Sequence, residues 1–182
     1  MIPLLLTAFG GYMIGSSVST RFAKGGLLKD ISIKEFGDDV VFRIGRRAIA
    51  VINKTTVMDA LDYEPYPKDK NRRKIWRKRQ KNYNLEYPKK ERFIKKNNLD
   101  LKKEVYYLDH IEVNPKYRGQ GLASRLMKAV LAWSKASDLE YIFLYRVAYD
   151  PWETALSDTE LKKFYKRYGF VDVGGGTMAK KL

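Results

Sequence analysis

Residues 111–123 read I-E-V-N-P-K-Y-R-G-Q-G-L-A, and this order of residue types predicts a strand, a glycine turn and a helix. The apolar run at 105–113 is typical of a strand. Gly119 and Gly121 let the backbone turn and approach a ligand closely, and the first amides of the following helix have no acceptors within it. With Arg118 beside them, these amides either bind a phosphate group or belong to a turn in which glycine only changes the chain direction.

Two other phosphate-binding motifs do not fit these residues. The dinucleotide-binding fingerprint requires a third glycine, and this chain has Ser124 at that position. A Walker loop requires Gly-Lys-Ser or Gly-Lys-Thr after the glycines, and neither tripeptide follows Gly121. The glycine pair by itself therefore does not identify the ligand.

Residues 113–123 resemble the acetyl-coenzyme A motif of the GNAT family of N-acetyltransferases, whose core is Arg/Gln-x-x-Gly-x-Gly/Ala. Arg118, Gly121 and Ala123 match that core. A second stretch, L-K-K-F-Y-K-R-Y-G-F at 161–170, is similar to the late helix and strand entry of the same family. The resemblance covers about a third of the 182 residues. It implies a single α/β (α+β) domain, with a mixed, mostly antiparallel sheet flanked by helices.

The resemblance also implies which residues bind acetyl-coenzyme A. Backbone groups near Ile111 and Val113 hold the pantetheine and polarise the thioester in that family. Asp158 stands where the family often has an asparagine that contacts the coenzyme, although its carboxylate is also explained as a helix cap. The residues implied to hold the pyrophosphate are Arg118, Gly119, Gln120, Gly121, Leu122 and Ala123.

Tyr165 is implied by the resemblance as the acid that protonates the departing thiolate. An amine that attacks a thioester also has to lose a proton. His110 and Glu112 lie on the strand before the glycine turn, and the alternation of a strand puts them on one face. We predict Glu112 as the base and His110 as the second choice, with Asp109 next to them. Each of the three is equally explained as a polar residue that faces solvent.

The flanking sequence supports the same domain type but departs from the family in one respect. Ser157 and Glu160 predict a capping box, Gly169 ends the helix, and 170–173 return as a strand. Near the N-terminus, β-branched residues separated by glycine turns predict antiparallel strands at 31–36, 40–44 and 48–52. The family usually has two helices between its first and second strands, and these three strands leave no room for them. Either the N-terminal apolar segment supplies that packing or the order of the first strands differs.

Composition limits the chemistry of the chain. Its 182 residues, 45% of them hydrophobic, suit one domain. The chain has no cysteine and a single histidine, so disulfides, thiolate metal sites and a covalent cysteine intermediate are excluded, and we expect no metal.

Residues 1–20 carry no charged side chain, and Arg21 and Lys24 follow them. As a helix this segment measures about 28 Å, against a hydrocarbon core of about 30 Å. Positive charge after the apolar run suits a membrane anchor with the domain in the cytoplasm, whereas the alternative is an arm packed on the domain or on a partner subunit. We therefore divide the chain into a segment and linker at 1–29 and a cytoplasmic domain at 30–182.

A basic insertion at 66–103 holds 16 Lys and Arg and 4 Asp and Glu, a net charge of +12 out of +15 for the whole chain. Trp76 lies within its most basic part at 70–81. Through 68–103 the insertion binds nucleic acid, docks on an acidic protein or an anionic membrane, or is simply a solvated surface. The loop at 147–153 is expected to border the acceptor site.

We expect an N-acetyltransferase that moves an acetyl group from acetyl-coenzyme A to a primary amine of a small molecule or a protein. A GNAT-fold binding module with weak or no catalysis, docked on an anionic partner, is the alternative from a different functional class. An acetyltransferase acting on nucleic acid, or on a protein bound to it, is a third. Fold alone does not decide among them.

Overall fold

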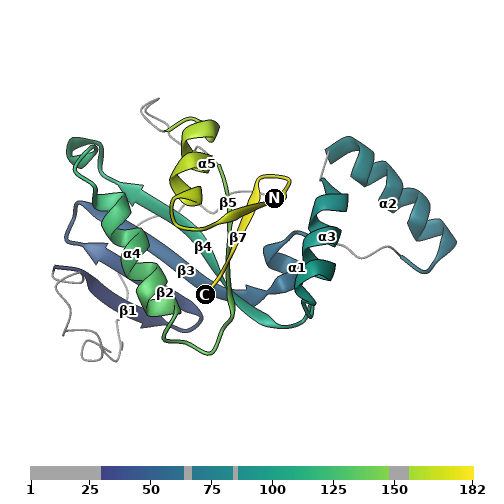
Figure 1. Cartoon of the computed structure of the whole chain (residues 1–182), viewed down its shortest axis with the longest axis horizontal. Helices are drawn as coiled ribbons and strands as arrows, with labels where there is room; N and C mark the ends of the chain where they lie inside the picture. The colour runs from purple at the N-terminus through teal and green to yellow at the C-terminus, as the bar shows by residue number, and fades with distance from the viewer. Residues whose placement is uncertain (1–29, 64–66, 84–85, 148–155) are drawn as a thin grey trace.

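The computed structural model describes residues 30–63, 67–83, 86–147 and 156–182 (Figure 1). The predictions for 1–29 and for most of the loop at 147–153 lie outside these ranges. Within them, no helix is long and apolar enough to cross a membrane.

A seven-stranded sheet forms the centre of the described part of the chain, in the order β1-β2-β3-β4-β5-β7-β6. Neighbouring strands are antiparallel except for the parallel pair β4–β5. The strands are β1 (Ser32–Phe36), β2 (Asp39–Ile44), β3 (Ala48–Thr56), β4 (Glu104–Val113), β5 (Tyr141–Tyr145), β6 (Val171–Gly174) and β7 (Thr177–Lys181). This mixed, mostly antiparallel sheet is the one that the sequence predicted.

The first three strands confirm the prediction that was made from the β-branched residues of the N-terminal part. Gly37 and Gly45 occupy the two turns with φ of +59° and +53°, a conformation that favours glycine. Because β2 follows β1 directly, no helix lies between them, as the sequence predicted. β3 continues to Thr56, beyond the predicted end at 52, because its last residues pair with the start of β4.

The helices come later in the chain. α1 (Val57–Ala60), α2 (Lys70–Tyr83) and α3 (Tyr87–Asn97) lie between β3 and β4, so the basic insertion contains two helices. After β4 come a short 3-10 helix, η2 (Pro115–Tyr117), then α4 (Leu122–Ser134) and α5 (Asp158–Lys166). In Figure 1, α2 extends away from the sheet beyond α3. An edge-to-face contact between Trp76 and Tyr87, with ring centroids 4.7 Å apart, joins these two helices.

Buried side chains form one cluster on each face of the sheet. On the first face, α4 packs on the central strands, and Phe164 of α5 joins the same cluster; its other members include Phe42, Leu108, Leu126, Val130 and Ile142. On the second face, α1 and α3 pack on the sheet through a cluster that includes Leu61, Val105, Phe143 and the partly buried Phe93 and Ile94. β4 and β5 contribute to both clusters, because alternate side chains of a strand point to opposite faces.

Candidate functional site

A bulge in β4 decides which side chains face which cluster. His110 pairs with Val51 and Leu108 pairs with Ile52, so Asp109 is an extra residue in the ladder. Leu108 and Ile111, three residues apart, both pack on the α4 side. The alternation that resumes after the bulge therefore puts His110 and Glu112 together on the opposite face.

β4 separates from β5 at the same place. The parallel pairing runs only from Tyr106 with Ile142 to Leu108 with Leu144. β4 continues to Val113 beyond this point, without β5 beside it. The section of β4 that carries Ile111 and Val113 thus has a backbone edge that does not hydrogen-bond to β5.

The glycine turn that follows β4 is open. Gly119 and Gly121 have φ of +76° and +74°, and an added Cβ atom at either position would meet no other atom within 4 Å. Gly121 caps α4, whose first backbone bond is donated by Arg125 to the Gly121 carbonyl at 3.0 Å. The amides of 122–124 therefore have no acceptor within the helix and lie at the positive end of its dipole.

Hydrogen bonds hold the approach to this turn in place. Arg118 Nε donates to the carbonyl of Val113 at 3.2 Å, which positions the guanidinium beside the end of β4. Asn114 Oδ1 accepts from the Lys116 amide at 3.1 Å, and the Asn114 amide donates to the carbonyl of Arg47 at 2.9 Å. The strand, the turn and the start of α4 are thereby linked to the turn between β2 and β3.

Tyr165 lies on α5 on the α4 side of the sheet. Its ring packs edge-on against Phe164 and Phe170, with centroids 5.3 Å and 5.9 Å away. Burial raises the pKa of Tyr165 to about 12. The phenol is therefore fully protonated at neutral pH, which is the state that an acid requires.

The polar residues of β4 occupy the other face of the strand. Asp109 Oδ2 lies 2.7 Å from His110 Nδ1, and this hydrogen bond holds the pKa of Asp109 below its ordinary value. Glu112 is exposed and pairs with Ile49 in the ladder. The structure thus brings His110 and Glu112 to one face, with Asp109 orienting the imidazole.

A sequence model of the acetyltransferase (GNAT) family matches residues 62–170, which is more than half of the chain. The chain belongs to the GNAT family. The matched range contains the helices of the basic insertion, β4, the glycine turn, α4, β5 and α5.

Several solved structures resemble this GNAT chain at low identity. Arabidopsis thaliana NAA60 in complex with a bisubstrate analogue has 12% identity and a TM-score of 0.46, over 81% of this chain and 78% of that one. A mosquito arylalkylamine N-acetyltransferase (like 5b) has 14% identity and a TM-score of 0.43, over 80% and 75%. The KacTA–DNA complex has 11% identity and a TM-score of 0.44, over 81% and 70%. A comparison with curated protein sequences gave no match.

Asp158, the first residue of α5, has a partner within the GNAT domain. Its Oδ1 accepts a hydrogen bond from Arg146 Nε at 2.6 Å. Arg146 follows β5, and its side chain is only 10% exposed. Asp158 thus balances a buried charge, whatever contact it makes with a coenzyme. The predicted capping box of Ser157 and Glu160 is confirmed at the same helix end.

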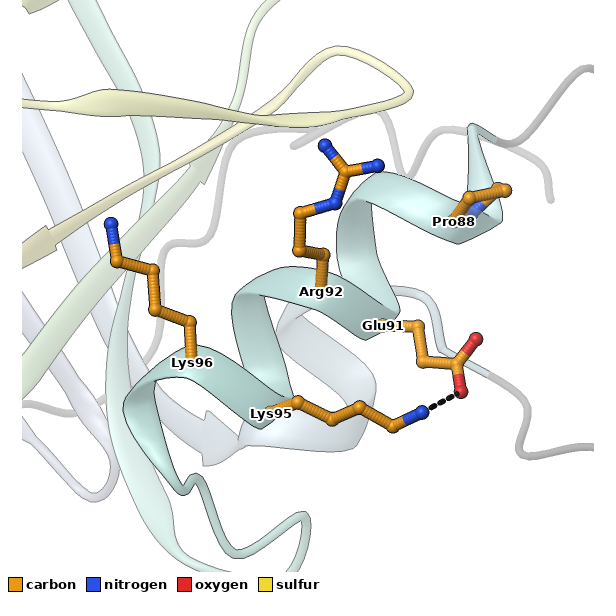
Figure 2. Close-up of a pocket in the computed structure, with 5 residues that line it drawn as sticks. All are labelled: Pro88, Glu91, Arg92, Lys95 and Lys96. Carbon is orange, nitrogen blue, oxygen red and sulfur yellow. Dashed lines mark ion pairs between the residues drawn. The ribbon is translucent and has the colours of Figure 1, made fainter.

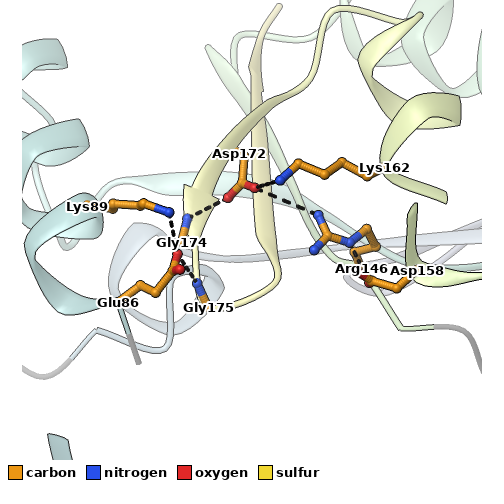
Figure 3. A network of polar contacts seen from close by, with 8 residues as sticks. All are labelled: Glu86, Lys89, Arg146, Asp158, Lys162, Asp172, Gly174 and Gly175. Carbon is orange, nitrogen blue, oxygen red and sulfur yellow. Dashed lines mark hydrogen bonds and ion pairs between the residues drawn. The ribbon is translucent and has the colours of Figure 1, made fainter. Parts of the chain in front are cut away.

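A network of charges joins α5 to the β6–β7 hairpin (Figure 3). Asp172 of β6 binds Lys162, accepts a bond from the Gly174 amide at 3.0 Å, and lies 3.9 Å from Arg146. Burial alone would raise the pKa of Asp172, but these hydrogen bonds and charges outweigh it and hold the pKa below the ordinary 3.8. Arg146 and Asp172 could not be identified from the sequence, because neither belongs to a motif or a regular spacing.

We expect Asp172→Asn to lower the free energy of unfolding by about 2 kcal/mol at neutral pH. That is less than the 3–5 kcal/mol of a fully buried pair, because Asp172 is 22% exposed. A folded pKa below the unfolded value stabilises the protein above pH 3.8, and this contribution is lost as the pH falls through the folded pKa. Urea unfolding at about pH 7 and about pH 3 should therefore show a difference between the two proteins that shrinks in acid.

The matched control for this experiment is Asp39→Asn at the exposed start of β2. It should change the free energy of unfolding by less than about 0.5 kcal/mol. A difference for Asp172→Asn that persisted unchanged in acid would contradict the role of its carboxylate.

Metal ligands do not gather at this site or elsewhere in the ranges that the structure describes. No group of three or more His, Cys, Asp or Glu side chains there could hold an ion. Two surface hollows border α3 instead, and none of the residues predicted to hold the coenzyme lines either of them.

Proposed function

We propose that this GNAT protein transfers an acetyl group from acetyl-coenzyme A to a primary amine of a small molecule or a protein. The open glycine turn between β4 and α4 carries the proposal. At this turn two glycines with positive φ leave free space next to helix amides that have no internal acceptor. A pyrophosphate fits such a turn, because its negative charge is stabilised by the amides and by the helix dipole.

The residues around the turn fit the rest of the coenzyme as well. The amides of 119–123 would bind the pyrophosphate, together with the Arg118 guanidinium and Gln120. The edge of β4 that lacks β5, at Ile111 and Val113, would hydrogen-bond to the pantetheine. We assign Asp158 to the same site as a neighbour of the coenzyme at the start of α5. Acetyl-coenzyme A supplies an activated acetyl thioester there.

Two side chains on opposite faces of the sheet would transfer the protons of the reaction. Glu112 takes a proton from the attacking amine as the new C–N bond forms. Tyr165 gives its phenolic proton to the sulfur as the C–S bond breaks, and a backbone amide of β4 stabilises the oxyanion. Because β5 does not cover β4 beyond Leu108, groups from both faces can border one reaction centre.

Two measurements on the full chain test this proposal. Calorimetric titration with acetyl-coenzyme A should show saturable binding, and thiol release should depend on added amine in a screen of small amines and lysine peptides. A folded protein that does not bind acetyl-coenzyme A would overturn the proposal. It would favour the alternative of a GNAT-fold binding module, which the basic surface of α3 supports.

The base can be identified by two substitutions on the same strand face. We expect Glu112→Gln to lower kcat by about 10²-fold or more, with little change in coenzyme binding. His110→Gln should have a smaller effect, because it leaves the Glu112 carboxylate, which we propose as the base, in place. Initial rates at saturating acetyl-coenzyme A measure both. A larger loss for His110→Gln would instead assign the base to the His110–Asp109 pair.

We also propose that 30–182 is a single domain that includes the basic insertion. One continuous sheet from β1 to β6 supports this division, and 1–29 would then lie outside the domain.

A further inference from the structure

A basic groove runs between α3 and the edge of the sheet formed by β6 and β7. It has a volume of about 600 Å³. Phe93 and Tyr141 contribute its apolar floor, and cationic side chains stand on both sides. We name it the α3 groove; its basic residues are Lys89, Arg92 and Lys96 on the helix and Lys181 on β7.

The cations of α3 differ in whether an acid neutralises them. Lys89 binds Glu86 at 2.9 Å, and Lys95, on the other side of the helix, binds Glu91 at 2.7 Å. Among the residues that the structure describes, no carboxylate lies within ion-pair distance of Arg92 or Lys96. Figure 2 shows both side chains pointing the same way from α3, towards the β6–β7 hairpin, while Lys95 turns to Glu91.

The one acid among the described residues that line the α3 groove is already neutralised. Asp172 binds Lys162 and accepts a hydrogen bond from the Gly174 amide. Arg92 and Lys96 are both exposed and stand one helical turn apart, about 6 Å along the helix axis. The groove therefore presents positive charge that a ligand with repeated negative charges would match.

We propose that the α3 groove binds the phosphodiester backbone of a single-stranded nucleic acid. A strand of linked phosphates can enter the groove and face the cations on both sides at once. A membrane is flat, so it cannot reach both sides of a concave surface together. A duplex is too wide to enter a hollow of about 600 Å³, since its major groove alone is about 12 Å across, whereas a flexible single strand can lay a short part of its backbone there.

This binding surface does not depend on the proposed acetyl transfer. No residue that we assign to the coenzyme lines the α3 groove. Nucleic-acid binding can therefore be present when coenzyme binding fails, and the reverse also holds. α2, which is rich in Lys and Arg over 70–78, extends beyond α3 (Figure 1).

Fluorescence anisotropy of the full chain with labelled 20-nucleotide oligouridylate and oligothymidylate tests the proposal. The test variant is the double substitution Arg92→Glu and Lys96→Glu, and both positions are exposed. We expect an affinity at least about tenfold lower than wild type at about 0.1 M salt, and a salt slope smaller by about 1.4, for two lost contacts at 0.7 each on a single strand. Circular dichroism shows whether the variant is folded, and Arg92→Gln with Lys96→Gln replaces it if it is not.

The matched control reverses two exposed charges at the other end of the sheet, Lys34→Glu on β1 and Arg43→Glu on β2. It changes the net charge by the same amount and should keep the wild-type affinity within about threefold, because it removes no contact to the strand. An equal loss in both double variants would mean that net charge alone attracts the strand, and would overturn the proposal. So would the absence of binding at about 0.1 M salt, or binding to vesicles of phosphatidylserine but not to either oligonucleotide.

Discussion

Gly121→Glu is expected to weaken the binding of acetyl-coenzyme A by about a hundredfold, which corresponds to about 2.7 kcal/mol. The new carboxylate would repel the pyrophosphate from the amides at the start of α4. Its side chain would also fill the space that is open next to Gly121, and a non-glycine residue is strained at φ of +74°. Calorimetric titration of both proteins measures the effect.

The matched control for this variant is Gly37→Glu in the turn between β1 and β2. Gly37 has φ of +59° and the same open space around it, so the substitution has a similar backbone strain and the same added charge. It should leave coenzyme binding unchanged. If both variants lost affinity equally, the effect would come from strain or net charge, and the glycine turn would not be the binding site.

Tyr165→Phe should lower kcat by about 10²-fold and leave the affinity for acetyl-coenzyme A within about twofold. The substitution removes only the hydroxyl, so the ring keeps its contacts with Phe164 and Phe170. Tyr168→Phe is the matched control, since Tyr168 lies on the next turn and packs on Phe164 at 5.2 Å. It should keep the wild-type kcat. Equal activity of the two variants would remove Tyr165 from the reaction.

The pH dependence of kcat is a second test of the role of Tyr165. A pKa raised to about 12 keeps the phenol protonated, and the acid competent, at every pH below about 11. Between pH 7 and about pH 10, the kcat of the wild type and that of Tyr165→Phe should therefore depend on pH in the same way. The wild type should show no additional fall in this range. Such a fall would mean that Tyr165 loses its proton much earlier than its burial allows.

The parts of the fold that could be predicted from the sequence carry local signals. β1 to β3 are β-branched runs between glycine turns, and α5 begins at a capping box. β6 starts at Val171, one residue later than predicted, because the Phe170 amide still bonds to the Tyr165 carbonyl.

Other features depend on contacts between distant parts of the chain. The apolar side of α3 is interrupted by Lys90, whose side chain is only 1% exposed and whose pKa is lowered by burial, so the sequence shows charge where the helix is buried. The charge network of Arg146 and Asp172 joins β5 to β6 and leaves no spacing in the sequence. The α3 groove combines a helix with the last strands of the chain for the same reason.

The same difference between local signals and contacts of distant parts of the chain applies to the site residues. The glycines at 119 and 121 are visible in the sequence because their conformation requires them. The bulge at Asp109 is not visible, since it arises from how β4 pairs with β3. The sequence correctly predicted that His110 and Glu112 share a face of the strand, because both follow the bulge. It could not show which of the two apolar clusters lies on the other face.

The extra residue in β4 also has a genetic consequence. Loss of the single codon for Asp109 would shorten the chain by one residue and make Leu108 and His110 direct neighbours, as their partners Ile52 and Val51 already are. Ile111 and Val113 would keep their places on the apolar cluster, and His110 and Glu112 would stay on the opposite face. A one-residue deletion reverses the faces of a regularly paired strand, so the strand should tolerate the loss of Asp109 better than the loss of a neighbouring residue that has a partner in the ladder.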